Sequence, residues 1–584
     1  MKQSVVATIL FTSMVTYSLT EARARTFNVK NYGAVGDGQH NDQPAIQAAV
    51  NAAITSGKGN TVYIPRGSYL LDPTDGDGNN TQIVISQASD LSMVGENGTY
   101  LINPVPTRGF IRVWGSSNTT IDHITMRQSH RLFSQVKVES VNASNNSIVV
   151  SVNKGFDDLN SKWIQQANQL LVFNDEASGS WGDHSASCSY YAPAYESVCW
   201  PPVVQSRTRI ANGKWRLGLN TTPQANYVGA TAVVWDQTNH SSALYLSVNN
   251  GFTISNSEYY PEGSDGLFYA KYNNGKFLIK NVTLSVPDGS GEFVAGYSGM
   301  WSANNKWDLD FENSTLIKVW DDVINTGAQY AKIVSKANST TINVDRASAI
   351  YAPGDTVSIW DWTPGSQYER SRAKITSVAC GPDVAGQVCT LQLDRPVDVR
   401  LTVNSTSVSR EDIADRLIDL AGVGSLKVNN CAIQGFHSSG IYSKASPTLI
   451  TNSMIFDTVG PAVAIGPSFN FGEGSSPNNI QIRNNTFIND SSSNVMIGTE
   501  RDGSKYIGAF MDGHDIDVSG NRFFLYGRFT RGAVGDTHYP IYLRYIESGK
   551  VNGNFILPYD GQVHGYGSTY KQYSPNVSVT NDYQ

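Results

Sequence analysis

The segment IQIRNNTFI (480–488) contains the pattern that decides the fold. Apolar and polar residues alternate at its start, two asparagines follow, and the alternation then resumes. Such alternation is typical of a β-strand with one buried face, and asparagine tolerates the left-handed backbone of a tight bend. The segment therefore predicts a strand, a sharp bend and a second strand.

The same unit recurs along the chain. Its copies are FTISNSEYY (252–260), FLIKNVTLS (277–285), LDFENSTLI (309–317), LKVNNCAIQ (426–434), LITNSMIFD (449–457), IDVSGNRFF (516–524) and GKVNGNFIL (549–557). Repeats with such a turn signal, about 20 to 50 residues apart, indicate a solenoid, because each coil can bury its apolar face only against its neighbours. Asparagine amides on successive coils can then hydrogen-bond to one another. We predict an all-β chain that forms a right-handed parallel β-helix, with a β-sandwich or a propeller as the alternative.

The amino-terminal stretch TFNVKNYGAVGDGQHNDQPAIQAAVNAAI (26–54) predicts a cap for this solenoid. Asn41 and Asp42 can cap an amphipathic helix over residues 43–54, whose apolar side chains lie on one face. The stretch resembles the opening of pectate-lyase-like β-helix proteins, in which such a helix covers the end of the solenoid. The resemblance implies a fold and no single activity, because lyases, hydrolases, epimerases and phage tailspikes share it.

Two segments interrupt the repeat, and each contains a similar strand, GATAVVW (229–235) in the first and GDTVSIW (354–360) in the second. We predict that each forms a small inserted β-barrel. The predicted organisation is a signal peptide (1–24), an N-terminal cap with the first coils (25–133), a first barrel module (134–236), coils that carry an acidic pair (237–329), a second barrel module (330–402), and C-terminal coils with a tail (403–584).

Composition argues for a protein that handles carbohydrate rather than nucleic acid or membrane. The formal charge of −7 is mild for 584 residues, and no block of Lys or Arg occurs. Residues 1–24 have a basic start, an apolar run and small residues near Ala24, which predicts a secretory signal and a secreted, extracellular protein. The alternative, a membrane anchor, needs an apolar run of about 20 residues, and this one is shorter. The oligomeric state is left open.

Cysteines and asparagines fit an oxidising, extracellular setting. The spacings of Cys188 with Cys199 and of Cys380 with Cys389 predict two local disulfides, with metal binding as the rival, while Cys431 is predicted to be a buried thiol. Glycosylation sequons begin at Asn79, Asn97, Asn118, Asn142, Asn145, Asn220, Asn239, Asn281, Asn313, Asn338, Asn404, Asn484, Asn489 and Asn576. These predict a glycoprotein, although the bends of the solenoid also call for asparagine.

The segment IKVWDDVIN (317–325) places two like charges side by side in a run of strand-forming residues. In a regular strand, Asp321 and Asp322 would point to opposite faces. A bend between two sheets can turn both toward one groove, where each raises the pKa of the other. One could then protonate a leaving oxygen while the other activates water. A calcium site or a solvated turn is the alternative.

With its surroundings, this segment resembles glycoside hydrolase family 110, the exo-acting α-1,3-galactosidases. That family carries a D-D-x-I-N-V-H-G motif on a coil just before an inserted barrel, and Asp321, Asp322, Ile324 and Asn325 match it. Farther on, FGEG (471–474) and IRNNTF (482–487) look like the family's later loop and strand. The resemblance thus implies roles for Phe471 in substrate binding and for Glu473 as a substrate-contacting or catalytic carboxylate.

This sequence departs from the family in two places. Thr326-Gly327-Ala328 stands where the family has Val-His-Gly, so a sugar-contacting histidine is missing. The acid expected one coil before the pair falls near Ser298, which leaves Asp265, Asp308 or Glu292 to replace it. Activity or linkage preference has diverged if none of them does so.

Aromatic residues near the acidic coil complete the candidate site. We predict that Trp301 and Trp320, together with Asp265, Asn325 and His437, contact substrate, because sugars stack well on such rings. Packing of the solenoid core is the alternative for each ring. The sequence predicts no cofactor and no metal. The expected function is inverting hydrolysis of a terminal α-galactoside; a polysaccharide lyase or epimerase, or a non-catalytic carbohydrate-binding protein, are the other hypotheses.

Overall fold

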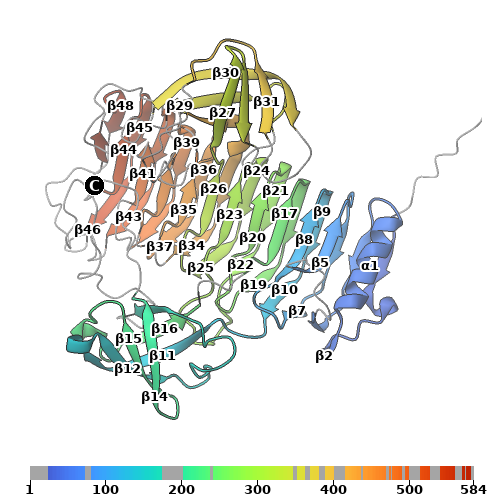
Figure 1. Cartoon of the computed structure of the whole chain (residues 1–584), viewed down its shortest axis with the longest axis vertical. Helices are drawn as coiled ribbons and strands as arrows, with labels where there is room; N and C mark the ends of the chain where they lie inside the picture. The colour runs from blue at the N-terminus through green and yellow to red at the C-terminus, as the bar shows by residue number, and fades with distance from the viewer. Residues whose placement is uncertain are drawn as a thin grey trace, which may run out of the picture.

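The computed structural model describes residues 24–72, 81–173, 202–236, 241–345, 351–361, 368–380, 388–399, 415–435, 438–458, 460–467, 473–474, 476–488, 494–498, 513–525, 539–558, 569–572 and 574–580. Three long parallel sheets wind around one continuous apolar core, so the chain is a parallel β-helix (Figure 1). Two modules project from it and flank the 11-stranded sheet in this view. The predicted signal peptide lies almost wholly outside the described residues.

The three sheets each take one strand from most coils. The 13-stranded sheet runs β1 (Thr26–Asn28), β3 (Thr61–Tyr63), β6 (Ser92–Val94), β9 (Ser117–Asp122), β18 (Asn250–Ser255), β21 (Asn274–Lys280), β24 (Lys306–Glu312), β33 (Ser425–Asn429), β36 (Thr448–Thr451), β39 (Asn478–Arg483), β42 (His514–Ser519), β45 (Gly549–Asn552) and β48 (Val577–Thr580). The 12-stranded sheet runs β2 (Asp37–Asn41), β4 (Gly67–Leu70), β7 (Thr99–Asn103), β10 (Thr125–Gln128), β19 (Glu258–Tyr260), β22 (Thr283–Leu284), β25 (Thr315–Val319), β34 (Ala432–Gly435), β37 (Met454–Phe456), β40 (Thr486–Ile488), β43 (Arg522–Leu525) and β46 (Phe555–Pro558). The 11-stranded sheet runs β5 (Thr81–Ser86), β8 (Gly109–Trp114), β17 (Leu244–Ser247), β20 (Phe268–Lys271), β23 (Met300–Ala303), β26 (Ile324–Gly327), β35 (Ile441–Ser443), β38 (Val463–Ile465), β41 (Val495–Gly498), β44 (Ile541–Arg544) and β47 (Thr569–Gln572).

Asparagine shapes the bends, as the sequence predicts. Asn256, Asn281 and Asn313 have φ of 50°, 53° and 51° between strands of the 13- and 12-stranded sheets. Their amides also form a ladder, because Asn281 Nδ2 donates to Asn256 Oδ1 at 2.9 Å. Two of these residues begin sequons, so the fold itself accounts for part of the asparagine count.

A second ladder of amides lies inside the solenoid, at the bend between the 11- and 13-stranded sheets. Asn249, Asn273 and Asn305 are buried on successive coils. Asn249 Nδ2 donates to Asn273 Oδ1 at 3.1 Å, and Asn273 Nδ2 donates to Asn305 Oδ1 at 2.9 Å. Stacked amides thus satisfy one another where no water reaches, which confirms the predicted ladder.

Helix α1 (Gln43–Thr55) covers the first end of the solenoid through Ile46, Ala49 and Val50, all fully buried. Of the two predicted capping residues, Asn41 accepts from the first helical N–H, that of Gln43, at 3.2 Å. The Asp42 side chain does not cap the helix, because its carboxylate accepts from the backbone N–H groups of Val35 and Gly36 at 2.6 and 2.9 Å. No helix among the described residues is long and apolar enough to cross a membrane.

The first module is a six-stranded antiparallel sheet in the order β13 (Gln169–Phe173), β16 (Thr231–Trp235), β11 (Phe133–Asn142), β12 (Ser147–Val152), β15 (Lys214–Leu219) and β14 (Val204–Ala211). Its two edges are joined by an antiparallel bridge between Gln169 and Val203, where Leu170 N donates to Pro202 O at 2.9 Å and Val204 N donates to Asn168 O at 2.7 Å. Among the described residues, the predicted barrel is therefore a six-stranded sheet whose edges meet at this bridge. Its predicted disulfide, Cys188 with Cys199, lies outside the described residues.

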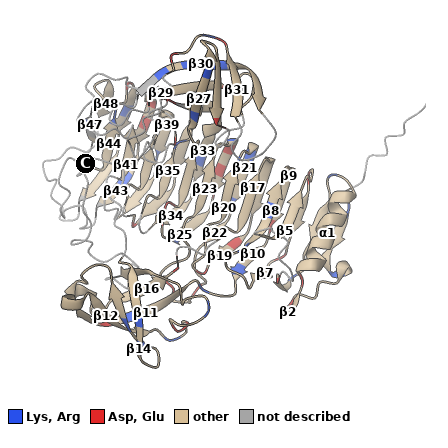
Figure 2. Cartoon of the chain, viewed as in Figure 1, with Lys and Arg blue, Asp and Glu red and all other residues tan. Residues whose placement is uncertain are grey.

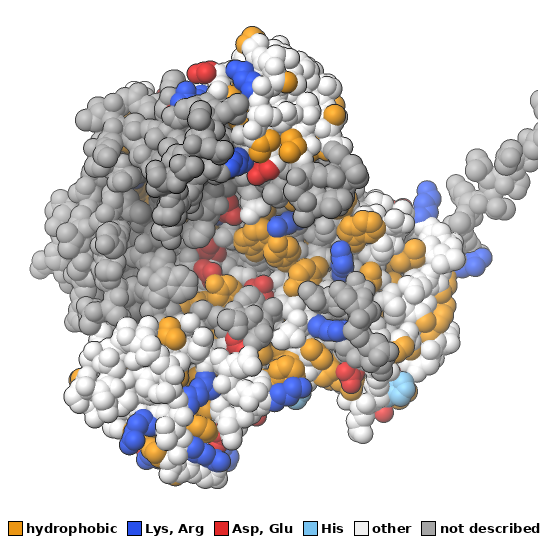
Figure 3. All heavy atoms as spheres, in the orientation of Figure 1, with side chains coloured by type: hydrophobic (Ala, Val, Ile, Leu, Met, Phe, Trp, Pro, Cys, Tyr) orange, Lys and Arg blue, Asp and Glu red, His pale blue; other side chains and the backbone are white. Residues whose placement is uncertain are grey.

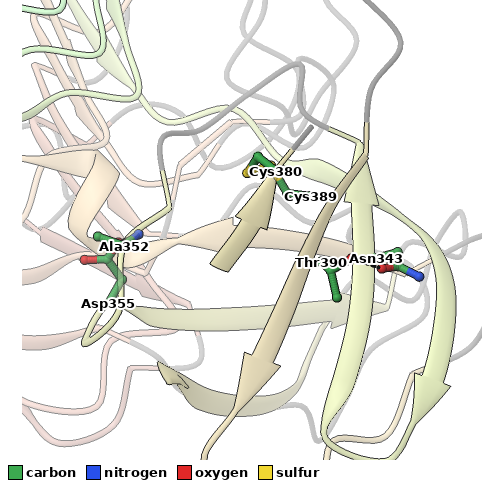
Figure 4. Close-up of a disulfide and its surroundings, with 6 residues drawn as sticks. All are labelled: Asn343, Ala352, Asp355, Cys380, Cys389 and Thr390. Atoms are coloured by element: carbon green, nitrogen blue, oxygen red, sulfur yellow. Dashed lines mark hydrogen bonds between the residues drawn. A yellow bond between two sulfur atoms is a disulfide. The ribbon is translucent and has the colours of Figure 1, made fainter. Parts of the chain in front are cut away.

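The second module is a closed barrel, as predicted. Its strands are β27 (Ala331–Asn338), β28 (Thr341–Asp345), β31 (Val388–Leu393), β30 (Tyr368–Cys380), β29 (Thr356–Asp361) and β32 (Arg416–Asp419). The closing strand β32 lies beyond residue 402, where the sequence predicts the module to end. A disulfide joins Cys380 to Cys389 across β30 and β31, and Cys431 is a buried free thiol, so both predictions are confirmed (Figure 4).

Candidate acidic site

The aspartate pair lies in the bend between β25 and β26, where the chain passes from the 12-stranded to the 11-stranded sheet. Lys318 begins the bend with a left-handed φ of 60°. The backbone N–H groups of Trp320 and Asp321 then donate to Gly296 and Tyr297 on the preceding coil, at 2.9 and 2.6 Å. The next coil contact requires glycine, because a methyl group on Gly299 would lie 2.1 Å from the Val323 carbonyl oxygen. The pair therefore sits on a tightly fixed backbone.

Asp322 is buried and held by three donors. Ser438 Oγ and Ser439 N donate to its Oδ1 at 2.6 and 3.0 Å, and Asn325 Nδ2 donates to its Oδ2 at 2.9 Å. Both serines come from the coil after the second module, so this carboxylate joins two coils. Burial raises the pKa of Asp322 to about 6, and the neighbouring charge of Asp321 adds to the rise.

Asp321 is partly exposed and belongs to a second group of side chains. Its carboxylate accepts hydrogen bonds from the Tyr297 hydroxyl and from the backbone N–H of Asp322. Burial raises its pKa above the usual range, and the charge of Asp265 acts in the same direction. The carboxylates of Asp321 and Asp265 in turn raise the pKa of Tyr297, together with burial, so this phenol remains a hydrogen-bond donor.

A buried lysine connects the pair to the third predicted acid. Lys444 Nζ donates to Asn325 Oδ1 at 2.8 Å and lies 3.3 Å from Glu473 Oε2. It also lies 3.4 Å from the centre of the Tyr442 ring. Its charge lowers the pKa values of both aspartates and so opposes their burial. The Lys444 ammonium thus interacts electrostatically with three carboxylates, those of Asp321, Asp322 and Glu473.

Glu473 reaches this place through a short backbone pairing. Gln329 and Glu473 form an antiparallel bridge, and Gly474 N donates to Ala328 O at 2.9 Å. The Glu473 side chain lies over Gly327, where an added methyl group would be 3.3 Å from Oε2. The structure therefore brings together the residues that we call the acidic site: Asp265, Tyr297, Asp321, Asp322, Asn325, Lys444 and Glu473.

Of the three candidates for the missing upstream acid, only Asp265 lies at this site. Ser298 Oγ donates to its Oδ1 at 2.6 Å, so Asp265 occupies the neighbourhood where the expected acid is replaced by serine. Glu292 is buried against Arg131, with 2.7 Å between Nη2 and Oε1. Asp308 is exposed on β24 and accepts from Ser425.

The two predicted tryptophans have different environments. Trp301 is partly exposed on the outer face of the 11-stranded sheet, directly beside Asn325 in register, and it stacks on Tyr269 at 4.7 Å. Trp320 is 1% exposed and packs edge-on against Trp235 of the first module. We therefore keep Trp301 as a candidate sugar contact and assign Trp320 to packing. Phe471 and His437 lie outside the described residues.

The face that carries the site lies between the two modules. Figure 3 shows acidic side chains along this face beside a group of hydrophobic ones. Lys444 is the residue that sequence reasoning missed, because the segment SKAS (443–446) contains nothing to distinguish a buried lysine from an exposed one. Tyr297 stands in the cluster of aromatics near the acidic coil, but nothing in its sequence context indicates a bond to Asp321.

Comparison with known proteins supports the fold more than the chemistry. The model of the family "Rhamnogalacturonase A/epimerase, pectate lyase-like" matches residues 26–103. Mannuronan C5-epimerase AlgE3 of Azotobacter vinelandii is 54% identical over 57 residues, which are 9% of this chain and 3% of that protein. Alginate lyase 7 of the same organism is 38% identical over 76 residues, 13% of this chain and 8% of that protein. This chain thus spans less than a tenth of these two relatives, and neither match is long enough to include a site that runs from Asp265 to Glu473.

Solved structures with a similar course cover most of the chain. The A-module of mannuronan C-5 epimerase AlgE4 from Azotobacter vinelandii covers 94% of this chain and 99% of its own, at 12% identity and a TM-score of 0.39. The surface adhesin PfbA of Streptococcus pneumoniae covers 96% and 89%, at 13% identity and a TM-score of 0.39. A family 28 exopolygalacturonase of Yersinia enterocolitica covers 96% and 78%, at 10% identity and a TM-score of 0.35. Scores of this size do not align individual coils, so the site is argued from its own geometry.

Proposed function

Because the chain is a pectate lyase-like parallel β-helix protein, with a fold that hydrolases, lyases and epimerases share, we propose that its acidic site is that of a glycoside hydrolase. The proposed reaction is inverting cleavage of a terminal α-galactoside. The observation that carries the proposal is the Asp321–Asp322 pair, whose carboxyls have raised pKa values beside the partly exposed Trp301. A glycosidase needs such a carboxyl to hold a proton near neutral pH.

The environments of the acids suggest their roles. Both aspartates have raised pKa values, and Asp321 is the partly exposed one, so Asp321 delivers the proton to the leaving oxygen. Asp265 is also partly exposed and takes a proton from the attacking water. Asn325 and Glu473 hold the sugar hydroxyls, and the buried Lys444 orients both of them. The sequence-based expectation differs, because it gives both acid and base to the adjacent pair.

Resemblance supports the choice of sugar. The motif shared by Asp321, Asp322, Ile324 and Asn325 is that of the α-1,3-galactosidases, and Asp265 supplies an acid where the sequence departs from that family. This replacement argues for a working enzyme over a carbohydrate-binding protein that has lost activity. Because the family's sugar-contacting histidine is missing, experiment must determine which α-galactosidic linkage is cleaved.

A lyase or epimerase is the second candidate, and Lys444 favours it. Such enzymes neutralise a uronate carboxylate with a cation or a phenol before they remove a proton, and Lys444 and Tyr297 could do so. Charge argues against this function, because four acids, Asp265, Asp321, Asp322 and Glu473, outnumber the two lysines that the described residues place here, Lys444 and Lys271, the latter 4.9 Å from the centre of the Trp301 ring. A uronate would meet a net negative site.

A screen of aryl glycosides and α-linked galacto-oligosaccharides tests the proposal. Hydrolysis releases reducing sugar without a rise in ultraviolet absorbance, whereas a lyase creates an unsaturated product that absorbs. We expect reducing sugar from an α-galactoside and an initial product of inverted configuration by NMR. Ultraviolet-absorbing product from a polyuronate would replace the proposal with the lyase, and turnover of no substrate would indicate a binding protein.

The pH profile gives an independent test. Burial raises the pKa of Asp321 above the usual aspartate value of 3.8, so its proton is kept to higher pH and is lost as pH rises through the raised pKa. We therefore expect kcat to fall, with a slope of one proton, as pH rises through a value above 3.8. A rate that keeps rising up to pH 8 would contradict the proposed acid.

A further inference from the structure

A second group of cavities lies where the first module leaves the solenoid. One, of about 320 Å³, is lined by Arg127, His130, Arg131 and Asp157, and the adjoining one, of about 560 Å³, by His130, Asp157, Lys162 and Trp163. The cavities share His130 and Asp157, so they form one depression. We call it the seam groove and define it by these six residues. Its volume is that of a small-ligand site.

The groove holds polar groups that the protein does not use. Arg127 touches Glu262 only through Nε, at 3.3 Å, which leaves both terminal nitrogens without a partner among the described residues. Among the described residues, the ammonium of Lys162 contacts the Trp163 ring alone, at 4.3 Å. The Asp157 carboxylate likewise forms no hydrogen bond or ion pair with any described residue. These side chains offer hydrogen-bond donors and acceptors to the same space.

Buried acids keep the arginines of the groove in place. Arg131 bridges Glu262 at 3.3 Å and Glu292 at 2.7 Å, and these two glutamates are 4% and 1% exposed. They hold the guanidinium groups in place, and the lining of the groove combines the cations Arg127, Arg131 and Lys162 with the acids Asp72, Asp157 and Glu262. Figure 2 shows basic residues on β10 beside acidic ones on β19, and Figure 3 shows Lys and Arg where the lower module meets the solenoid.

An aromatic pair forms the wall of the larger cavity. The rings of His130 and Trp163 stack at 5.8 Å with an interplanar angle of 29°, and Trp163 is partly exposed. Aromatic rings beside hydrogen-bonding side chains are the usual recognition elements for a sugar ring. The acidic site shares none of the residues that line the groove.

We propose that the seam groove is a second, non-catalytic saccharide site that binds a sugar with an anionic substituent, a carboxylate or a sulfate ester. Arg127 and Lys162 bind the anion, Asp157 accepts from hydroxyl groups, and the His130–Trp163 pair packs against the ring. The proposal does not depend on hydrolysis at the acidic site. It provides a way for the protein to hold an acidic glycan while the acidic site acts on an uncharged residue.

Calorimetric titration of the whole chain with three tetrasaccharides tests this. The probes are tetragalacturonate, a sulfated galactotetraose and neutral galactotetraose. We expect at least one anionic probe to bind at least tenfold more tightly than the neutral one, and its affinity to fall as salt increases. The probe that binds more tightly identifies the anion as carboxylate or sulfate.

Variants locate the binding. The double variant Arg127→Gln with Lys162→Gln should lower the affinity for the anionic probe at least tenfold. The control variant Arg216→Gln with Lys276→Gln removes two exposed cations elsewhere and should leave that affinity within twofold of wild type. Thermal melting checks that both double variants are folded. The proposal is overturned if no anionic probe binds, if the two double variants weaken binding equally, or if Trp301→Ala abolishes binding while the groove variant retains it.

Discussion

Asp321 and Asp322 share one bend yet face different partners, so single substitutions separate their roles. Asp321→Asn removes the proposed proton donor, and Asp265→Asn removes the proposed base. Each should lower kcat by at least ~100-fold, the usual contribution of general acid–base groups. Stopped assays with the best α-galactoside give the rates. Asp308→Asn is the matched control and should remain near wild type, because Asp308 is an exposed acid on β24, in the 13-stranded sheet away from the site.

Asp322 also predicts how stability depends on pH. Its pKa is about 6 in the folded chain against 3.8 in the unfolded one, so the folded form binds more protons between these values. The stability that this group contributes is complete below pH 3.8 and is lost as pH rises through 6. The Asp322→Asn variant does not lose this stability as pH rises, because it has no carboxyl at this position. Relative to wild type, the variant should therefore gain about 1 to 3 kcal/mol between pH 4 and pH 7.5.

Denaturant unfolding of both proteins at the two pH values measures this difference. The comparison cancels the hydrogen bonds that the substitution alters and every titrating group that does not interact with Asp322; the effect of Asp322 on the neighbouring Asp321 remains part of the measured difference. A difference in unfolding free energy that is the same at both pH values would show that Asp322 has no raised pKa.

The sequence predicted the acids of the site but not the group that connects them. Sequence reasoning could find Asp321, Asp322 and Asn325, because two like charges in a strand pattern are unusual. It could find Glu473 because a family motif marks it. The structure brings all four together. Lys444 follows an ordinary strand, and its burial depends on Tyr442, Asn325 and Glu473, which contacts between coils bring to it.

At the bends, buried asparagine side chains join successive coils and so fix their positions relative to one another. Asn273 accepts from both the backbone and the side chain of Asn249, at 3.0 and 3.1 Å. Asn273→Ala leaves these buried donors without an acceptor, at a cost of about 2 to 3 kcal/mol, because an unmade hydrogen bond costs the full desolvation of the group. Asn274→Ala, at the exposed neighbouring position, should cost under about 0.5 kcal/mol.

Thermal melting of the two variants provides the comparison. Equal midpoints would mean that water or a backbone shift replaces the amide, and that the ladder contributes little to stability.

The strands and bends were predicted from local sequence pattern. Most of them are confirmed, because every coil must bury one apolar face and turn sharply at the same places. The failures arose where distant groups compete for a residue. Asp42 looks like a helix cap but binds the backbone of residues 35–36 instead. The first module has the strands of a barrel, yet whether its outer strands pair depends on positions that no local pattern specifies.

At the level of the whole molecule, the first module is part of the support of the acidic site. Trp235 packs on both Trp320 and Tyr297, at 5.9 and 5.6 Å between ring centres. The module can be removed without strain, because its ends meet where Asp236 N donates to Leu132 O at 3.1 Å. Replacing residues 133–235 by a short Gly-Ser linker should preserve the β-helix by circular dichroism.

That deletion should nevertheless lower stability by several kcal/mol, on the order of a lost buried tryptophan, and reduce kcat, since Trp320 and Tyr297 lose their packing partner. Melting and the α-galactoside assay measure both effects. The control shortens the β14–β15 hairpin at residues 211–214, on the outer part of the module, and should have little effect. Full activity without the module would show that the solenoid alone fixes the site.

The placement of the modules also bears on the order in which a ribosome delivers the parts of the site. Asp322 emerges 116 residues before Ser438, its donor, and the whole barrel must be translated between them. Strand β25 has no following coil to pair with until β34 is made, so solenoid growth pauses there while the barrel folds by itself. During that pause the acid pair lacks the serines, Lys444 and Glu473. A nascent chain stalled before residue 438 should therefore carry a folded amino-terminal solenoid with no catalytic capacity.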